Sequence, residues 1–480
     1  MTIDPAQLDT EITGVTADSR RVRRGNLFAA LPGTRDDGRR FIVDAVERGA
    51  AAVLAPEGTK VTDLLRKVAL ITDNNPRKRY ATMAARYFAR QPETVAAVTG
   101  TNGKTSVAVF LRQIWARLGY PAASAGTLGT EVSDAGEDIY LGGSLTTPDP
   151  AELHAMLAEL KGRGVEHLAI EASSHGLDQY RLDGVAIRAA AFTNLSRDHL
   201  DYHGDENRYF NAKRRLFSEL LPHDGCAVLN ADHPRSDELR QQARERGCRV
   251  ITTGFDGKEI HLLEQHPSPG GQRLVVELFG QRIGIDLPLV GSFQASNALI
   301  SLGLAIGCDA DPEAASVALS GLRSVRGRLE KVAELENGAA IYVDYAHTPD
   351  ALSTVLCAIR PHVKGRLAVV FGCGGDRDSG KRPLMGRAAF THADRVIVTD
   401  DNPRTEDPAD IRKQTMVGCP DAVEIGDRAT AIQAGAQSLG PGDVLVVAGK
   451  GHEQGQIVGD RTIPFDDASV VRAALSEVRG

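Results

Sequence analysis

The segment from Val95 to Ser106, VAAVTGTNGKTS, constrains this chain more than any other part of its sequence. Its small and β-branched apolar residues predict a buried strand, and a helical pattern opens at Val107. Between the two, Gly100 and Gly103 allow a tight turn and a close approach of the backbone to a ligand. A glycine turn between a strand and a helix presents backbone N–H groups to phosphate. The segment therefore predicts a phosphate-binding loop.

The residues that close the turn extend this prediction to a nucleoside triphosphate. Lys104 can reach the β- and γ-phosphates, and the Thr105 hydroxyl is a suitable ligand for Mg²⁺. Val98 stands where the usual phosphate loop has its first glycine, so the segment is a shorter G-x-x-G-K-T form. The alternative is a glycine turn that merely joins a core strand to a helix. The predicted nucleotide-binding residues of the loop are Gly100, Thr101, Asn102, Gly103, Lys104, Thr105 and Ser106.

Composition and charge limit the classes of function. The chain has 480 residues, enough for about three domains, and its 42% hydrophobic and 25% charged residues are typical of soluble globular proteins. Its net charge of −7 argues against a nucleic-acid partner. The N-terminus shows no signal peptide, no apolar run reaches the length of about 18 residues that a membrane-spanning helix needs, and six cysteines lack any C-x-x-C pair. We expect a cytoplasmic monomer without membrane insertion.

Alternating strand and helix patterns predict an α/β protein of three domains, residues 1–90, 91–326 and 327–480. The first is a small α/β domain that ends near a linker at Pro92, and the second carries the phosphate loop on a mostly parallel sheet, with an antiparallel hairpin over Leu274–Leu289. The predicted elements of these two domains are strands at Gly25–Leu31, Ala51–Leu54, His167–Glu171, Ile187–Asn194, Gly225–Asn230 and Arg249–Gly254, and helices at Ile42–Arg48, Pro150–Arg163 and Tyr209–Leu221.

In the third domain each predicted strand ends in a polar or glycine-rich loop. The strands are Ala340–Asp344, Leu367–Phe371, Val396–Thr399 and Val444–Val447, and the loops are Asp344–His347, Gly372–Arg377, Asp400–Arg404 and Gly449–Glu453. Ligands bind at the carboxyl ends of strands in open α/β sheets. The pattern therefore predicts a second binding site at one edge of this sheet.

Two further clusters in the second domain carry titratable side chains. Glu171 ends an apolar run, where a carboxylate is placed to bind Mg²⁺, although a solvated glutamate at a strand end is the alternative. The loop Asn194–Gly204 contains five aspartate, histidine and arginine side chains. A single histidine is usually structural, but this density indicates a site.

Ten motifs along the chain together resemble those of the Mur ligases. In order, they read GTNGKT, EASSHGLDQYR, NLSRDHLDYHG, YFNAKRRLF, GSFQASNAL, GRLE, DYAHTPDAL, GCGGDRDSGKRPLMG, DNPR and AGKGHE. The resemblance covers essentially the whole chain, and it is strongest to those members that add the third residue of the peptidoglycan stem peptide. It implies a first domain that binds the UDP end of the substrate, a central ATPase domain and a Rossmann-like third domain that brings the amino acid.

The resemblance also implies a reaction and its metal ions. A substrate carboxylate attacks the γ-phosphate of ATP, and an incoming amine displaces phosphate from the resulting acyl phosphate. Lys104 and Arg328 would stabilise the phosphoryl charge. One Mg²⁺ would be held by Thr105 and Glu171, and a second by His199 and a carbamylated lysine that matches Lys213. By its pattern alone, Lys213 is one more solvated helix lysine.

The remaining site residues are carried over from the family motifs. The resemblance places Asn297 near the adenine, and it places Arg328, Asp344 and His347 on ATP from the third domain. UDP-N-acetylmuramoyl-L-alanyl-D-glutamate would meet Ser19, Thr34 and Arg35 at its uridine end and Thr146, Thr147, Ser173, Gln179 and Arg181 at its dipeptide end. For these hydroxyls, capping and loop solvation are the alternative roles.

The amino acid implied by the resemblance is meso-diaminopimelate. Its contacts would be Arg377, Asp401, Asn402, Pro403, Arg404, Gly449 and Glu453. Arg404 can bind the distal carboxylate in a bidentate fork, and the lysine-adding relatives lack this arginine. Glu453 suits an ammonium group.

Three alternatives stay open at this point. Arg404 argues against a lysine-adding relative, and the N-terminal segment together with the DNPR motif argues against a folylpolyglutamate-type ligase. A nucleotide-switch binding protein would require a guanine-reading Asn-Lys-x-Asp sequence, which is absent, and it would give the third-domain loops no role.

Overall fold

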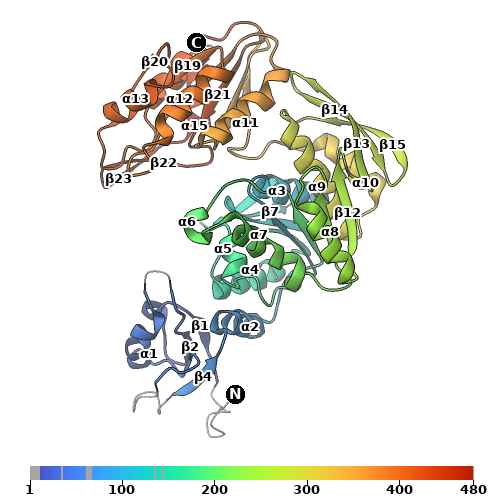
Figure 1. Cartoon of the computed structure of the whole chain (residues 1–480), viewed down its shortest axis with the longest axis vertical. Coiled ribbons are helices and arrows are strands. Elements are labelled where there is room, and N and C mark those ends of the chain that lie inside the picture. Colours follow the sequence, from blue (N-terminus) through green and yellow to red (C-terminus); the bar gives the residue numbers. More distant parts are fainter. Residues whose placement is uncertain (1–10, 34–35, 61–67, 135–136, 143–144, 479–480) are drawn as a thin grey trace. The chain divides into compact units, whose positions relative to one another are not determined.

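The computed structural model describes residues 11–33, 36–60, 68–134, 137–142 and 145–478. Figure 1 shows the helices and strands of the chain, coloured along the sequence. The chain divides into two compact units. The first unit comprises Met1–Thr253 and Ile300–Asp311, and the second comprises Gly254–Leu299 and Pro312–Gly480. Each unit combines a mostly parallel sheet with helices, which confirms the predicted α/β class.

The first unit begins with a four-stranded parallel sheet in the order β1-β2-β3-β4. Its elements are β1 (Gly14–Thr16), β2 (Asn26–Ala29), α1 (Ile42–Glu47), β3 (Ala52–Pro56), β4 (Ala69–Asp73) and α2 (Pro76–Phe88). Alternate residues of β2 point to opposite faces, so that Phe28 shares a core with Ala45 of α1 while Leu27 packs with Tyr80 of α2. Because both faces are buried, the strands appear in the sequence as continuous apolar runs.

A second sheet in the first unit holds the strands of the predicted central domain, in the order β12-β11-β10-β5-β9-β6-β7-β8. Its elements are β5 (Thr94–Thr99), α3 (Lys104–Arg117), β6 (Ala122–Gly126), β7 (Gly129–Asp134), β8 (Glu137–Gly142), α4 (Pro150–Gly162), β9 (His167–Glu171), α5 (Ser174–Asp178), β10 (Ala189–Phe192), α6 (Leu200–His203), α7 (Glu206–Arg215), a π-helical turn (Leu216–Leu220), β11 (Cys226–Asn230), α8 (Ser236–Glu245) and β12 (Arg249–Gly254). Strand β5 lies between β9 and β10 and is parallel to both. The phosphate loop therefore follows a central strand, at the carboxyl edge where ligands bind.

The second unit begins with an antiparallel meander of β13 (Ile260–Ser268), β14 (Gly271–Leu278) and β15 (Gln281–Leu287). The predicted hairpin is thus confirmed and gains a third strand. The helices α9 (Ser292–Gly307) and α10 (Pro312–Ala318) follow, and α9 contributes residues to both units.

The main sheet of the second unit has the order β16-β17-β21-β18-β19-β20, in which only β16 is antiparallel to its neighbour. Its elements are β16 (Glu330–Glu334), β17 (Ala340–Asp344), α11 (Pro349–Ile359), β18 (Leu367–Phe371), α12 (Lys381–His392), β19 (Arg395–Val398), α13 (Pro408–Met416), β20 (Val423–Glu424), α14 (Arg428–Gln437), β21 (Val444–Ala448), the hairpin of β22 (Gly455–Val458) and β23 (Arg461–Pro464), and α15 (Asp467–Val478). Val369 packs with Met385 of α12, whereas the next residue, Val370, packs with Ile432 of α14. Helices therefore cover both faces, as the resemblance to a Rossmann-like domain implies.

Four helices begin with the same local signal, a capping side chain followed by proline. The caps of α2, α4, α11 and α13 are Asn75, Asp149, Thr348 and Asp407, and each side-chain oxygen accepts a hydrogen bond from a backbone N–H in the first turn. Proline suits the next position because its fixed φ matches the helix and its missing N–H would have no partner there. Among the described residues, no helix is long and apolar enough to cross a membrane.

A fully buried ion pair joins two helix starts in the second unit. Nε and Nη2 of Arg428, at the start of α14, donate to the two carboxylate oxygens of Asp467, at the start of α15, over 2.7 Å each. Nη2 also donates to the carbonyl oxygen of Ala448 at the end of β21 (3.0 Å). The pair therefore fixes both helices against the strand edge that carries the predicted amino-acid loops.

We predict that Arg428→Met lowers the free energy of unfolding by about 3–5 kcal/mol, because it leaves the Asp467 carboxylate buried and unpaired. Urea unfolding followed by circular dichroism measures this, since the one tryptophan, Trp115, lies in the first unit. Arg48→Ala, which removes the exposed partner of Asp44, is the matched control and should change stability little. Equal effects of the two substitutions would contradict the prediction.

Candidate active site

The phosphate loop has the backbone geometry that an anion site requires. Gly100 has a φ of 148°, and a Cβ at this position would collide with Oγ1 of Thr193. Gly103 has a φ of 87°, and α3 begins directly after it at Lys104, three residues before the predicted start at Val107. No side chain caps this helix. Its first N–H groups, at the positive end of the helix dipole, are therefore available to phosphate.

Two lysines converge on the carbonyl oxygen of Gly100. The Nζ of Lys104 donates to it over 2.9 Å and to the carbonyl oxygen of Thr101 over 2.7 Å. The Nζ of Lys213, on α7, donates to the same Gly100 oxygen over 2.7 Å. Lys213 is only 1% exposed, so its interpretation as a solvated helix lysine is wrong. Burial, followed by the nearby Lys104 charge, holds the pKa of Lys213 well below its ordinary value.

Glu171, at the end of β9, is 1% exposed, which also rules out the solvated alternative for this side chain. Its carboxylate oxygens accept hydrogen bonds from the backbone N–H of Thr127 (2.8 Å) and from the Thr127 hydroxyl (3.2 Å). Thr105 is buried at the start of α3, whereas His199 is exposed with a φ of 52°. Within the described ranges, no three histidine, cysteine, aspartate or glutamate side chains gather as a metal site.

The predicted dipeptide-binding residues form one hydrogen-bonded chain beside Glu171. The Thr147 hydroxyl donates to the carbonyl oxygen of Glu171 (3.0 Å) and accepts from the N–H and hydroxyl of Ser173 (3.1 and 3.0 Å). Arg181 donates to the carbonyl oxygen of Thr147 (2.6 Å) and to Oε1 of Gln179 (2.8 Å). Ser173 in addition caps α5, as its alternative role required. The structure therefore assembles these side chains into a continuous polar wall.

The other predicted substrate contacts of the first unit are Thr146, Ser19, Thr34 and Arg35. The hydroxyls of Thr146 and Thr127 are 2.9 Å apart, which links Thr146 to the Glu171 network. Ser19 is buried in the short turn after β1. Thr34 and Arg35 lie outside the described residues.

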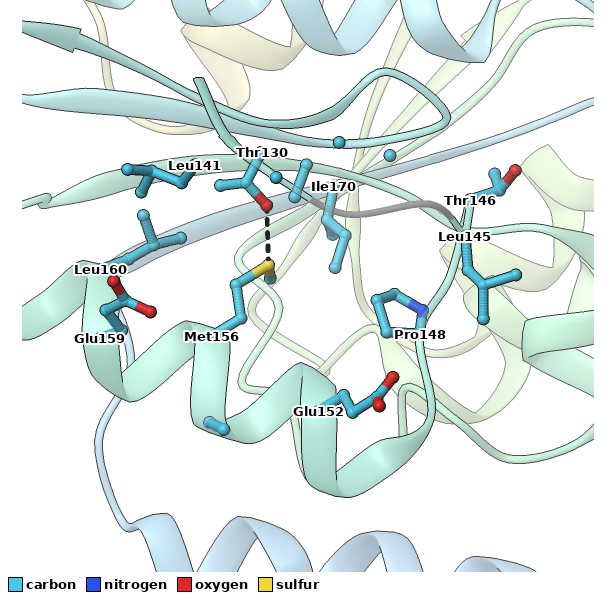
Figure 2. Close-up of a pocket in the computed structure, with 15 residues that line it drawn as sticks. Thr130, Leu141, Leu145, Thr146, Pro148, Glu152, Met156, Glu159, Leu160 and Ile170 are labelled. Atoms are coloured by element: carbon cyan, nitrogen blue, oxygen red, sulfur yellow. Dashed lines mark hydrogen bonds between the residues drawn. The ribbon is translucent and has the colours of Figure 1, made fainter. Parts of the chain in front are cut away.

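Two pockets in the first unit differ in chemistry. Figure 2 shows the larger one, about 390 Å³, between α4 and strands β7, β8 and β9. Its wall is mainly apolar, including Leu141, Met156 and Ile170, and the Thr130 hydroxyl donates to the Met156 sulfur over 3.1 Å. The smaller pocket, about 280 Å³, is lined by Gln179 and Arg181 and is the better fit for a charged substrate.

In the second unit, the four predicted loops do follow parallel strands at one edge. A buried lysine, Lys450, joins two of these loops, those after β19 and β21, because it donates to Oδ1 of Asn402 (3.0 Å) and to Oε2 of Glu453 (2.9 Å). The Asn402 amide donates to the same Glu453 oxygen (3.0 Å). Burial alone would raise the pKa of Glu453, but the Lys450 ammonium and these hydrogen bonds lower it. Glu453 is therefore held as a carboxylate.

Arg404 occupies a left-handed backbone conformation, with a φ of 53°. Its Nη1 donates to the carbonyl oxygen of Gly375 (2.7 Å), which joins the loops after β18 and β19. At Gly449, where φ is 115°, a Cβ would lie 2.9 Å from Oδ2 of Asp401, so glycine is required. Pro403 is buried beside these residues, and Arg377 is exposed.

The residues predicted to reach ATP from the third domain surround the start of β16 and the end of β17. The buried Asp344 carboxylate accepts from the N–H groups of Leu329 (2.7 Å) and Ala346 (2.8 Å), and burial raises its pKa. The Arg328 guanidinium lies over the Tyr345 ring, 4.7 Å from its centre. The Nδ1 of His347 is 2.8 Å from the Tyr345 carbonyl oxygen. Asn297, which was predicted near the adenine from the central domain, is buried and donates to Gln294.

Sequence reasoning missed three side chains that build these sites. Lys450 stands inside the AGKGHE motif, but a charged residue between two glycines suggests a solvated loop. Thr127 holds Glu171 from outside every recognised motif. Arg77 lines the smaller pocket, although its position on α2 gives it no sequence signal.

Comparisons with known proteins match this chain along its length. Three family models match it: "Mur ligase family, catalytic domain" over residues 11–99, "Mur ligase middle domain" over 98–305 and "Mur ligase, glutamate ligase domain" over 327–451. The UDP-N-acetylmuramoyl-L-alanyl-D-glutamate–2,6-diaminopimelate ligase of Bradyrhizobium diazoefficiens is 53% identical over 99% of this chain and 97% of its own. That of Caulobacter vibrioides is 52% identical over 99% of this chain and 97% of its own.

Solved structures agree with these matches. A structure of a ligase with the same name is 34% identical, covers 98% of this chain and 96% of its own, and has a TM-score of 0.74. MurF ligase from Thermotoga maritima in complex with ADP shares the fold, with a TM-score of 0.63 at 19% identity, and covers 98% of this chain and 99% of its own.

We predict that Lys104→Ala abolishes ATP binding in calorimetry and lowers turnover by about 10²–10³-fold, because it removes a preorganised cation from the phosphate loop. The fold should survive, since the two carbonyl oxygens that Nζ contacts lie in the loop itself. Arg117→Ala, an exposed cation at the other end of α3, is the matched control. ATP binding that survives in Lys104→Ala would show that the phosphates bind elsewhere.

Proposed function

Because this chain belongs to the Mur ligase family, we propose that it joins meso-diaminopimelate to UDP-N-acetylmuramoyl-L-alanyl-D-glutamate, with release of ADP and phosphate, in peptidoglycan precursor synthesis. One observation carries the proposal: the 53% identity to a diaminopimelate ligase over 99% of this chain. We further propose that the protein is a cytoplasmic monomer. Its three domains would be residues 1–90, which bind the UDP-muramoyl group, residues 91–326, which bind ATP, and residues 327–480, which bind the amino acid.

In this proposal the phosphate loop binds ATP. The uncapped first turn of α3 and the backbone from Gly100 to Thr105 would receive the phosphates. Lys104 would exchange its two carbonyl partners for phosphate oxygens, which are stronger acceptors. Ser106 continues the same turn. Asn297 would face the adenine, and Arg328, Asp344 and His347 would act on ATP during turnover.

The donor set suits Mg²⁺, which prefers oxygen ligands. Thr105 and Glu171 would hold one ion, and His199 and Lys213 a second, provided that Lys213 carries a carbamate. A buried amine with a lowered pKa favours that modification, because only the neutral amine reacts with CO₂. Bound Mg²⁺ would offset the negative charge that accumulates when a carboxylate approaches ATP.

The chain's own residues would also orient the substrate for the reaction. The polar wall of Thr146, Thr147, Ser173, Gln179 and Arg181 would orient the dipeptide so that its terminal carboxylate meets the γ-phosphate. Attack by this carboxylate breaks the bond to ADP and gives an acyl phosphate. The amine of diaminopimelate then forms the amide bond as phosphate leaves.

The loops of the second unit would bind the amino acid by its charges. The ionised Glu453 would pair with an ammonium group, and Arg404 would grip the distal carboxylate. Asp401, Asn402, Pro403 and Gly449 would shape the site around these two, and Arg377 would add a second cation. Lysine offers no distal carboxylate, so this arrangement favours diaminopimelate.

A coupled phosphate-release assay tests the proposal. UDP-N-acetylmuramoyl-L-alanyl-D-glutamate and ATP are supplied with meso-diaminopimelate, with L-lysine or with no amino acid. We expect phosphate release and amide product only with diaminopimelate. Nucleotide exchange without a condensed product would instead support a nucleotide-switch protein.

Arg404→Ala should lower kcat/KM for meso-diaminopimelate by about 10³-fold or more and leave that for L-lysine unchanged or higher. A site built around a charged partner rejects an analogue that lacks it by about 10⁴-fold, because the buried charge stays unpaired. Arg404→Lys should restore activity only in part, since an ammonium cannot form the planar fork. Arg387→Ala, an exposed arginine on α12, serves as the control. Equal losses for both amino acids in Arg404→Ala would remove Arg404 from specificity.

Lys213 should carry a carbamate in the active enzyme, visible in native mass spectrometry as the added mass of one CO₂. Lys213→Ala should lose most activity and recover part of it with a short carboxylate, because the missing group is an oxygen ligand. Arg214→Ala, which changes the exposed neighbour on α7, should keep normal activity. Full activity of Lys213→Ala without added carboxylate would refute the modification.

A further inference from the structure

The smaller pocket of the first unit contains a cation that no motif identified. The pocket lies where the start of α2 meets the segment before α4 and the end of the 173–181 segment. Its wall carries two guanidinium groups, those of Arg77 and Arg181, and one carboxylate, that of Asp149. Arg181 is a predicted substrate contact, but Arg77 is not.

Neither guanidinium is neutralised by an ion pair within the described residues. Arg77 donates through Nη2 to the carbonyl oxygen of Pro32 (2.6 Å), and Arg181 donates to the carbonyl oxygen of Thr147 (2.6 Å) and to Gln179 (2.8 Å). Uncharged oxygens thus orient both groups without cancelling their charge. The two cations also repel each other: after burial and the opposing effect of Asp149, Arg77 lowers the pKa of Arg181.

The one carboxylate in the wall is occupied elsewhere. Asp149 Oδ1 accepts hydrogen bonds from the Tyr80 hydroxyl (2.8 Å) and from the Ala151 N–H (3.0 Å), where it caps α4. Burial also raises the pKa of Asp149. The pocket therefore keeps a surplus of positive charge.

We propose that Arg77 binds, together with Arg181, one anionic group of the uridine nucleotide substrate, either its diphosphate or a peptide carboxylate. The inference rests on the proposed function for the identity of that substrate. Two oriented guanidiniums facing one pocket suit an oxyanion, because each offers planar paired N–H donors. The ligand would then connect α2, in the N-terminal part of the unit, with the wall that ends at Arg181. Through its hydrogen bond to the Pro32 carbonyl oxygen, Arg77 also positions the backbone at Pro32.

The central test compares Michaelis constants in the full-length enzyme. Arg77→Gln should raise KM for UDP-N-acetylmuramoyl-L-alanyl-D-glutamate about tenfold or more, as expected for loss of a hydrogen bond to a charged group. KM for ATP and for diaminopimelate should change less than about twofold. Arg77→Lys should show a smaller defect, and its defect should grow with ionic strength. Arg86→Gln, an exposed arginine on the same helix, is the matched control.

A double substitution tests whether the two arginines share one anion. The effects of Arg77→Gln and Arg181→Gln on nucleotide KM should not multiply in the double variant, because residues that contact one group are coupled. Inhibition by UDP then shows whether the bound anion is the diphosphate or a peptide carboxylate. A weaker inhibition constant for UDP in Arg77→Gln assigns the diphosphate, and an unchanged constant with a raised substrate KM assigns the peptide carboxylate.

Two results would overturn the proposal. One is a nucleotide KM for Arg77→Gln within about twofold of wild type. The other is equal weakening of uridine, which has no anionic group, and UDP, since Arg77 would then only hold the Pro32 loop. If Arg77→Gln does not fold, the same comparison is made with Arg77→Lys. Failure of the proposed function is distinct, because the wild type itself would then release no phosphate with diaminopimelate.

Discussion

A single carbonyl oxygen, that of Gly100, accepts hydrogen bonds from two lysine side chains, and the phosphate loop of the first unit is arranged around this contact. The two lysines lie on α3 and α7, so their hydrogen bonds to Gly100 connect both helices to the loop after β5. Burial, followed by the nearby Lys104 charge, lowers the pKa of Lys213. The uncapped first turn of α3 adds its N–H groups to this loop, in agreement with the proposed phosphate site. Only glycine fits at residue 100, because a Cβ would strike Thr193.

The proposed amino-acid site of the second unit depends on the direction of its strands. Strands β17, β21, β18 and β19 run parallel, so their carboxyl ends meet at one edge and bring together loops that lie up to about a hundred residues apart in the chain. Helices on both faces bury the strands and leave this edge as the place for polar chemistry. In both units the proposed sites thus lie at strand ends, while the buried apolar side chains lie between each sheet and its helices.

Sequence patterns predicted what depends on local periodicity and missed what depends on contacts between distant segments. The strands at His167–Glu171 and Arg249–Gly254 were predicted with the observed bounds, because buried parallel strands are short apolar runs. The strands β6, β7 and β8 were missed, since small and polar residues dominate β6 and β7. No periodicity shows that Lys213 is buried or that Arg77 faces a pocket. These facts arise from packing between elements far apart in the chain.

The two proposed sites are expected to bind ligands of different charge. Around the phosphate loop, Lys104 and Lys213 donate hydrogen bonds to backbone carbonyl oxygens. At the edge of the second unit, Lys450 is paired with Glu453, and the fully buried Arg428 with Asp467. An amino acid carries both signs of charge, so its site needs fixed partners of each sign with little net surplus. Phosphate needs a surplus of one sign. The ion pairs at the edge of the second unit therefore agree with the mixed charge of the amino acid that this edge is proposed to bind.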